Sequence, residues 1–108
     1  MHNVARESAA VRAFREWILE HPSDCYGLKI KGDKNTRDQP DYIGVYKGRC
    51  FAFEFKAVGA VPRKSQASII RKWKRAGAIV GAPTSRDEAV ALLRAAVDLQ
   101  LTQGVCHE

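Results

Sequence analysis

Three charged side chains, Asp41, Glu54 and Lys56, have the types and the spacing to hold a divalent cation against a phosphate. Carboxylate oxygens suit Mg²⁺, and an ammonium group stabilises negative charge that grows on a phosphate during hydrolysis. The three residues lie at the two ends of residues 40–56, which have the pattern of a β-hairpin. Their chemistry therefore depends on whether the hairpin brings its ends together.

The register of this hairpin is predicted by its loop, Lys47-Gly48, because Gly at the second position suits a two-residue turn. The predicted strands are residues 41–46 and 49–56. In that register Asp41 lies opposite Glu54, with Cβ atoms about 4.5–5.5 Å apart. Two opposed carboxylates repel each other, and a bound cation would turn that repulsion into attraction.

Strand alternation separates the aromatic residues of the second strand from its charged residues. The three Phe side chains point to one face, as a core requires, whereas Asp41, Glu54 and Lys56 point to the other. The alternative is a surface ion pair between Lys56 and either carboxylate, with no chemical role.

The length of 108 residues indicates a single domain, residues 1–108. No apolar run is long enough to span a membrane, and the first residues do not have the pattern of a signal segment. The cysteines and histidines form neither a zinc motif nor a disulfide framework: Cys25, Cys50, Cys106, His2, His21 and His107. We therefore expect an intracellular, cytoplasmic protein with free thiols and no membrane partner.

The net charge of +6 and the sequence pI of about 9.5 favour an anionic partner, with nucleic acid the first candidate. The alternative is that a small basic protein is merely soluble. The basic side chains form two clusters, and we expect both to contact DNA: Lys29, Lys31, Lys34 and Arg37 in one, Arg63, Lys64, Arg71, Lys72, Lys74 and Arg75 in the other.

The first predicted element is an amphipathic helix over residues 4–20, ended by His21-Pro22. Glu7 lies within its apolar stripe, where a carboxylate needs a partner. Alternatively, the helix starts near Glu7, and the acid there favours the positive end of the helix dipole. The pattern leaves both interpretations open.

The remaining pattern predicts a short strand at residues 28–30, a polar loop at 32–39 and a second loop at 58–64. Ser65 is expected to cap a helix over 66–76, closed by Gly77, in which Gln66 points inward. A strand at 78–82 and a helix at 86–101, with a capping box of Ser85 and Glu88, complete the chain. The order predicts a mixed sheet flanked by helices in an α/β architecture, with a parallel β-α-β crossover.

With this pattern the chain resembles the VRR-NUC domain of the PD-(D/E)XK nuclease superfamily, over about residues 4–95. The matching residues are Glu7, Pro40-Asp41, Glu54-Phe55-Lys56-Ala57, Ser65-Gln66, Gly77-Ala78 and Ile79-Val80. Two features depart from the pattern of the family. Asp38-Gln39 stand where a Gly-x-Pro-Asp motif has Gly, and Ser65 and Gln66 are adjacent rather than spaced.

The resemblance implies a restriction-endonuclease-like mixed β-sheet core flanked by α-helices, in the order α-β-β-β-α-β-α. The expected ligands of Mg²⁺ or Mn²⁺ are oxygen atoms of Asp41, Glu54, Phe55 (its carbonyl) and Glu7. Lys56 would orient a water or stabilise the phosphate, and Gln66 would orient the water or the phosphate.

Small stand-alone members of this family occur in phages and look like homodimeric enzymes that resolve four-way junctions. The resemblance therefore implies a metal-dependent endonuclease for branched DNA. Trp17, Val45 and Leu99 are apolar positions that we expect to be exposed and able to contribute to a dimer interface, but the sequence does not single out that interface. Alternatives are a nuclease for flaps, nicks or plain duplex, or a catalytically silent nucleic-acid-binding module of the same fold. A structural protein with an ion-pair network is a further alternative.

Overall fold

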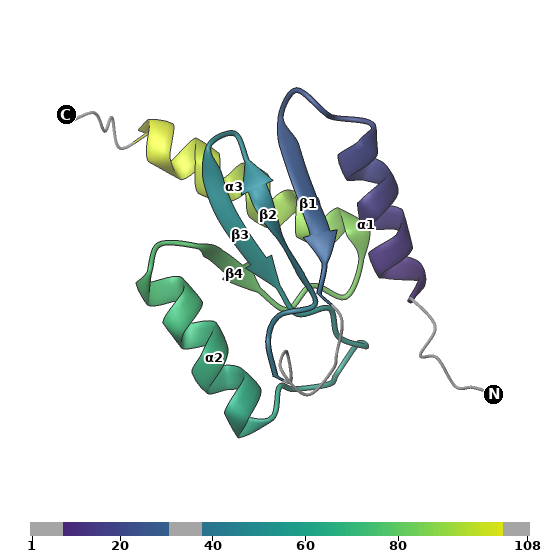
Figure 1. Ribbon diagram of the computed structural model, residues 1–108, viewed down its shortest axis with the longest axis vertical. Coiled ribbons are helices and arrows are strands. Elements are labelled where there is room, and N and C mark those ends of the chain that lie inside the picture. Colours follow the sequence, from purple (N-terminus) through teal and green to yellow (C-terminus); the bar gives the residue numbers. More distant parts are fainter. Residues whose placement is uncertain (1–7, 31–37, 103–108) are drawn as a thin grey trace.

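The computed structural model describes residues 8–30 and 38–102, and these form a mixed α/β fold. The elements are α1 (Ala9–Leu19), β1 (Cys25–Lys29), β2 (Tyr42–Tyr46), β3 (Arg49–Phe53), α2 (Lys64–Arg75), β4 (Ile79–Gly81) and α3 (Arg86–Thr102) (Figure 1). The predicted order of helices and strands and the α/β class with a mixed sheet flanked by helices are confirmed.

The sheet has the strand order β1-β2-β3-β4. Strand β2 pairs antiparallel with both β1 and β3, whereas β3 and β4 pair parallel. The parallel pair requires a crossover, and α2 provides it between β3 and β4 (Figure 1).

The β2–β3 hairpin has the predicted register, with Tyr46 opposite Arg49 and Tyr42 opposite Phe53. Lys47 and Gly48 have φ values of 47° and 84°, and positive φ at both loop positions is what a type I′ turn requires. Strand β2 begins one residue after Asp41 and β3 ends one residue before Glu54, whereas the predicted strands included both acidic residues. Asp41 and Glu54 are therefore opposed just beyond the paired ladder.

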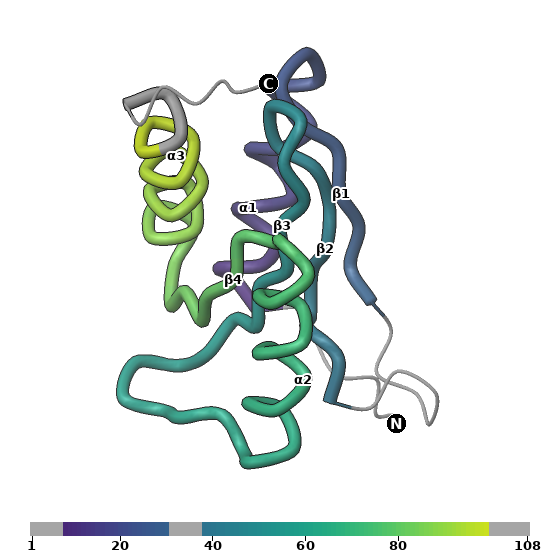
Figure 2. Tube along the Cα trace, turned by 90° about the vertical axis from the view of Figure 1, so that its left-hand side faces the viewer, coloured from purple at the N-terminus to yellow at the C-terminus, as the bar shows by residue number. Residues whose placement is uncertain are grey.

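The hydrophobic core lies between one face of the sheet and the helices α1 and α3, which stand on the same side of the strands (Figure 2). Phe14 of α1 is fully buried at its centre. Its ring centroid lies 5.4 Å from that of Tyr42, 5.7 Å from that of Phe51 and 5.6 Å from that of Phe55. The predicted core face of the second strand is thus confirmed.

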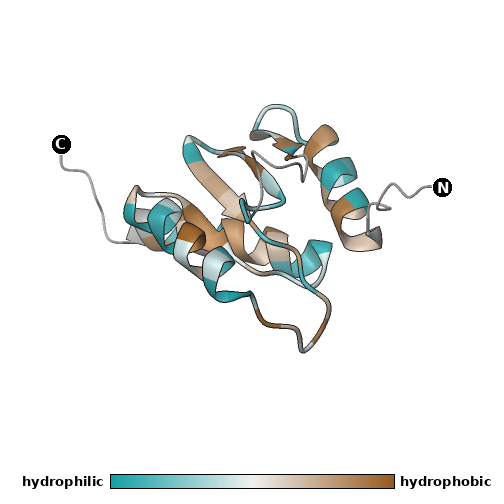
Figure 3. Cartoon of the chain, turned by 60° about the horizontal axis from the view of Figure 1, so that its bottom comes forward, coloured by the Kyte–Doolittle hydropathy of each residue, from teal (hydrophilic) through white to brown (hydrophobic). Residues whose placement is uncertain are grey.

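Helix α2 covers the opposite face at the β3–β4 edge, where Ala52 is fully buried. This helix contains Lys and Arg but no Asp or Glu, and hydrophilic residues recur along its ribbon in Figure 3. The β1–β2 half of the same face is open, so that Tyr26, Leu28 and Val45 are exposed. The two faces of the sheet therefore differ in both cover and charge.

The N-terminal part of the fold departs from the prediction in three places. Helix α1 begins at Ala9, where the Ser8 hydroxyl accepts a hydrogen bond of 3.1 Å from the backbone N–H of Val11, and not near residue 4. Strand β1 begins at Cys25, earlier than predicted. Trp17 is half-buried rather than exposed, because its ring stacks on those of Phe14 and His21.

The two later helices start differently from the predicted caps. Helix α2 begins at Lys64 with Arg63 as its N-cap, so Ser65 lies inside the helix. At α3 the Ser85 hydroxyl accepts from the N–H of Glu88 at 3.1 Å, as predicted. The Glu88 carboxylate, however, accepts from the N–H of Thr84 at 2.6 Å instead of from Ser85, because its side chain reaches one residue further back.

Within the described residues no helix is both long and apolar enough to cross a membrane. Cys25 is buried and Cys50 is exposed, and both are free thiols as predicted. Several residues considered above lie outside the described part of the chain: His2, Glu7, Lys31, Lys34, Arg37, Cys106 and His107.

Candidate functional site

The site begins where β3 ends, because residues 54–56 continue alongside the β4 segment. The N–H of Glu54 donates to the carbonyl of Gly81 at 3.0 Å, and that of Lys56 donates to the carbonyl of Pro83 at 3.0 Å. The chain therefore stays extended, and alternation continues. The Phe55 side chain enters the core, while those of Glu54 and Lys56 point toward α2.

Asp41 is fixed on the other side of this segment. Its Oδ2 accepts a hydrogen bond of 2.9 Å from the N–H of Phe55, the backbone donor that faces β2. Its own carbonyl accepts from the N–H of Ile30 at 2.7 Å. The carboxylate of Asp41 thus replaces the backbone acceptor that a longer β2 would provide, and it is held next to Glu54.

Glu54 is a buried carboxylate, with a relative exposure of 5%. Its Oε2 accepts from Gln66 Nε2 at 2.9 Å and forms an ion pair of 3.3 Å with Lys56 Nζ. Gln66 Oε1 in turn accepts from Lys56 Nζ at 3.0 Å and from the N–H of Arg63 at 3.1 Å. Glu54, Lys56 and Gln66 therefore form a closed triangle, here called the polar triangle.

The second carboxylate oxygen of Glu54, Oε1, differs from the first in its contacts. Glu54 Oε1 is buried, and it is without a hydrogen-bond partner among residues 8–30 and 38–102. A buried polar atom without a partner costs about 1–3 kcal/mol, and more when it is charged. A cation bound between Asp41 and Glu54 would satisfy this oxygen, so the residues present fit a divalent metal ion.

The electrostatics of the acidic pair, Asp41 and Glu54, also favour a bound cation. Burial raises the pKa of Asp41, and the N–H of Phe55 and the charges of Lys29 and Lys56 oppose that rise. Burial, and then the charge of Asp41, raises the pKa of Glu54 against the effects of Lys56 and Gln66. The pKa of each carboxyl is raised on balance, because the nearby positive charges do not fully offset the effect of burial and, for Glu54, of the neighbouring Asp41 carboxylate.

The predicted metal ligands are brought together only in part. Asp41 lies close enough to Glu54 to raise its pKa. Phe55 directly follows Glu54 in the chain, and its backbone N–H donates to Asp41. Glu7, predicted as a further ligand, lies outside the described residues. In the described part of the chain, no cluster of three or more His, Cys, Asp or Glu could hold a metal ion.

The predicted DNA-contacting residues separate into groups. Lys29 lies close enough to Asp41 to favour its charged form, so it belongs to the site. Arg63 forms an ion pair with Asp38, which partly neutralises its charge. The exposed basic residues of α2 are Lys64, Arg71, Lys72, Lys74 and Arg75.

Two side-chain links join α2 and its N-cap residue to the segment before Asp41, and the sequence pattern predicts neither of them. One is the Arg63–Asp38 ion pair, and the other is a hydrogen bond of 3.2 Å from Trp73 Nε1 to Gln39 Oε1. Asp38 has a φ of 68°, in the left-handed region that favours Gly. Asp38 and Gln39 thus form a turn of the kind that favours Gly, and their side chains attach it to Arg63 and Trp73. No local pattern could reveal contacts between residues so distant in sequence.

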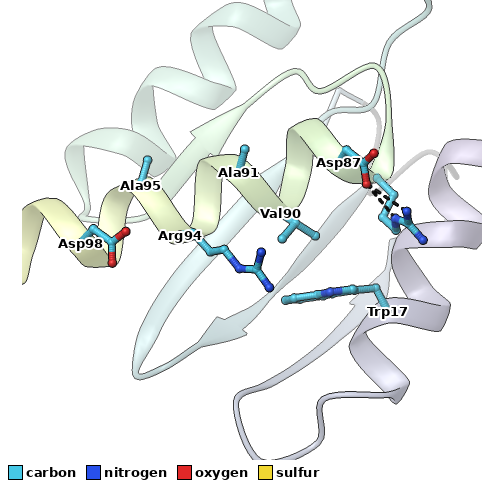
Figure 4. Close-up of a pocket in the computed structure, with 8 residues that line it drawn as sticks. Trp17, Asp87, Val90, Ala91, Arg94, Ala95 and Asp98 are labelled. Carbon is cyan, nitrogen blue, oxygen red and sulfur yellow. Dashed lines mark hydrogen bonds and ion pairs between the residues drawn. The ribbon is translucent and has the colours of Figure 1, made fainter.

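A groove between α1 and α3 lies on the core side of the sheet, away from the acidic pair (Figure 4). The Arg94 guanidinium lies 6.0 Å from the ring centroid of Trp17, and Arg86 pairs with Asp87 at 3.0 Å. These charges are already paired or stacked, and they present no carboxylate pair. The candidate site is therefore the one at the hairpin end.

Comparison with known proteins gives no assignment, because no protein-family model matches this sequence and no curated protein matches it significantly.

Proposed function

We propose that this protein is a divalent-metal-dependent DNA endonuclease that hydrolyses phosphodiester bonds. The observation that carries the proposal concerns the buried carboxylate of Glu54, which lies opposite Asp41 and beside Lys56. One of its oxygens has no partner in residues 8–30 and 38–102. A purely structural ion-pair network would gain by satisfying both oxygens of a buried carboxylate. This network leaves Glu54 Oε1 without a partner in the described residues, and a cation held by Asp41 and Glu54 would supply one.

The proposed metal is Mg²⁺ or Mn²⁺, held by the carboxylates of Asp41 and Glu54 with the carbonyl of Phe55 as a further ligand. When bound, such an ion supplies Lewis-acid polarisation of the phosphate and a lower pKa for a coordinated water. Asp41 is fixed by the N–H of Phe55, and Glu54 by Gln66, so both ligands are oriented before the ion arrives.

Lys56 is the proposed group that contacts the phosphate. An ammonium has three donors, and Lys56 Nζ directs two contacts at Gln66 and Glu54. The third donor is left for a phosphate oxygen or the attacking water. Gln66 positions Lys56 through its carbonyl oxygen and Glu54 through its amide nitrogen, and it therefore acts as a positioning residue.

The basic surface of α2 supports DNA as the substrate. Its Lys and Arg lie on the side of the sheet that carries the acidic pair, and phosphate contacts supply most of the affinity for DNA that does not depend on sequence. With the resemblance to VRR-NUC domains, we propose a restriction-endonuclease-like fold and a branched substrate such as a four-way junction. Flaps, nicks and plain duplex remain alternative substrates.

The test is cleavage of branched and linear DNA with Mg²⁺, Mn²⁺ or EDTA. We expect metal-dependent cleavage that falls by about 10²–10³-fold in Asp41→Ala and Lys56→Ala. Asp98→Ala and Lys47→Ala change exposed charges elsewhere and should keep full activity. Cleavage that persists in EDTA, or full activity in both site variants, would contradict the proposal.

The second candidate function is a nucleic-acid-binding module without nuclease activity. The basic helix α2 supports this candidate as much as it supports the nuclease. Calorimetry separates the two, because the nuclease binds Mn²⁺ and loses that binding in Glu54→Ala. DNA binding without any metal binding would favour the module.

A further inference from the structure

The segment that joins Lys56 to α2 exposes apolar side chains to solvent. Val58 is 87% exposed and Val61 is 79% exposed, and Ala60 between them is also exposed. Residues 57–62, here called the apolar loop, project from the lower part of the molecule with apolar residues near the tip (Figure 3). Exposed apolar side chains gathered at one protruding point commonly mark a contact surface.

Both ends of the apolar loop are fixed to the candidate site. Its first end follows Lys56, whose N–H is bonded to Pro83, and its last end meets Arg63, which pairs with Asp38 and bonds Gln66. A turn inside it is closed by a hydrogen bond of 3.0 Å from the N–H of Ala60 to the carbonyl of Ala57. Val58 is two residues from Lys56, so their Cα atoms are within about 7 Å.

The charge around the apolar loop selects the kind of partner. From Phe55 to Arg86 the sequence contains no Asp or Glu, while Lys and Arg recur on both sides of the loop. A second copy of this chain would bring like charges together at such a surface. A polyanion with apolar surfaces inside, which is the chemistry of stacked DNA bases, complements both the loop and its basic surroundings.

We propose that the apolar loop is a wedge that inserts Val58 and Val61 into the base stack beside the scissile phosphate. Insertion costs stacking energy, and that cost is smallest where the stack is already interrupted. The loop would therefore direct the site to DNA with a branch, flap or nick and disfavour continuous duplex. This inference rests on the proposed nuclease function, whose substrate class it specifies.

The experiment places 2-aminopurine at the branch point of a DNA junction and replaces Mg²⁺ by Ca²⁺ to slow cleavage. We expect the wild-type protein to raise the fluorescence of the probe, because the unstacked base is less quenched. Val58→Ser/Val61→Ser should lose most of that rise. In Mg²⁺ the ratio of kcat/KM for branched over continuous DNA should fall about tenfold.

Two further variants control for unspecific effects. Leu19→Ser makes a similar change at an exposed position of α1, and it should behave as wild type. Val58→Ile/Val61→Ile keeps the apolar character and should preserve the fluorescence rise. Circular dichroism of each variant checks that the fold is retained.

The wedge is overturned if wild type cleaves the junction without any fluorescence rise, or if the Ser variant matches wild type in both measurements. It is also overturned if the Ser variant changes only the mass found by light scattering, which would assign the loop to self-association. The nuclease function fails separately, by absence of metal-dependent cleavage in wild type. A loop-dependent fluorescence rise in Ca²⁺ would then still support insertion.

Discussion

At the residue scale, the decisive feature is the unequal treatment of the two oxygens of Glu54. Oε2 accepts a hydrogen bond from Gln66 and forms an ion pair with Lys56, whereas Oε1 is buried without a partner in the described residues. The same side chain is raised in pKa by burial and by Asp41. A buried carboxylate in this state is a costly element of structure and a suitable ligand for a cation.

The raised pKa values determine how the acidic pair responds to pH. Between the ordinary carboxyl pKa, about 4, and its raised value, the folded state binds more protons than the unfolded chain. The contribution of Asp41 and Glu54 to stability is therefore greatest below that window and declines as pH rises through it. The proposed cation would bind the deprotonated pair and offset this loss of stability.

We predict that Mn²⁺ raises the melting temperature of the wild-type protein more at about pH 7.5 than at about pH 4.5, because deprotonated carboxylates are the ligands. At a concentration of about 100 Kd the stabilisation is about 2.7 kcal/mol, or roughly ten degrees for a domain of this size. Differential scanning fluorimetry measures it.

The variant Glu54→Gln should lose most of this metal-dependent shift, since its amide is a much poorer ligand for the cation. Glu16→Gln, at an exposed position of α1, is the matched control and should keep the shift. An equal shift in both variants, or one independent of pH, would remove the acidic pair as the metal site.

At the scale of elements, α2 links the parts of the site. Its first turn presents Gln66 to Glu54 and Lys56, and Trp73 further along bonds Gln39. Its outer surface carries basic residues without any acid. One helix therefore positions the polar triangle, supports the turn before Asp41 and presents positive charge beside them.

Arg71 and Arg75 lie one turn apart on the exposed stripe of α2, and we predict that they contact DNA phosphates. In Arg71→Gln/Arg75→Gln the slope of log Kobs against log salt should become shallower by about 1–2, because each lost phosphate contact removes about 0.9. Fluorescence anisotropy with a labelled junction across a salt series gives the slope.

The control for this measurement is Arg12→Gln/Arg94→Gln, which removes the same charge from α1 and α3 on the other side of the sheet. Its salt slope should remain that of the wild type. If the two double variants weaken binding equally, general charge explains the affinity and α2 has no special role.

At the scale of the whole molecule, the two sides of the sheet have different tasks. The core side, between the sheet and helices α1 and α3, provides the aromatic packing around Phe14. The other side carries α2, the acidic pair and the open β1–β2 half with exposed Tyr26 and Val45. Each chain presents one proposed site, so paired cuts at a junction require two copies.

We predict that the protein is a dimer in solution or on junction DNA, with the open half of the sheet face as one candidate interface. Light scattering coupled to size exclusion measures the mass. Val45→Lys should shift it toward the monomer, whereas Leu19→Lys on α1 should not. A wild-type monomer at micromolar concentration, with and without junction DNA, would argue against junction resolution.

The local pattern of the sequence determined the elements and the centre of the site. A period of two and a Lys-Gly turn are enough to predict that Asp41 opposes Glu54, because hairpin register depends only on neighbouring residues. The helix starts were less predictable. Arg63 rather than Ser65 precedes α2, since Gln66 turns back to accept the N–H of Arg63.

Only the tertiary structure decided which contacts support the site and which buried oxygen has no partner in the described residues. The links from Asp38 to Arg63 and from Gln39 to Trp73 join residues far apart in the chain, and they form only when α2 packs against the sheet. The same packing buries Glu54 and leaves Oε1 without a partner in the described structure. Burial and the satisfaction of a polar atom are properties of the packed molecule, and therefore no local pattern contains them.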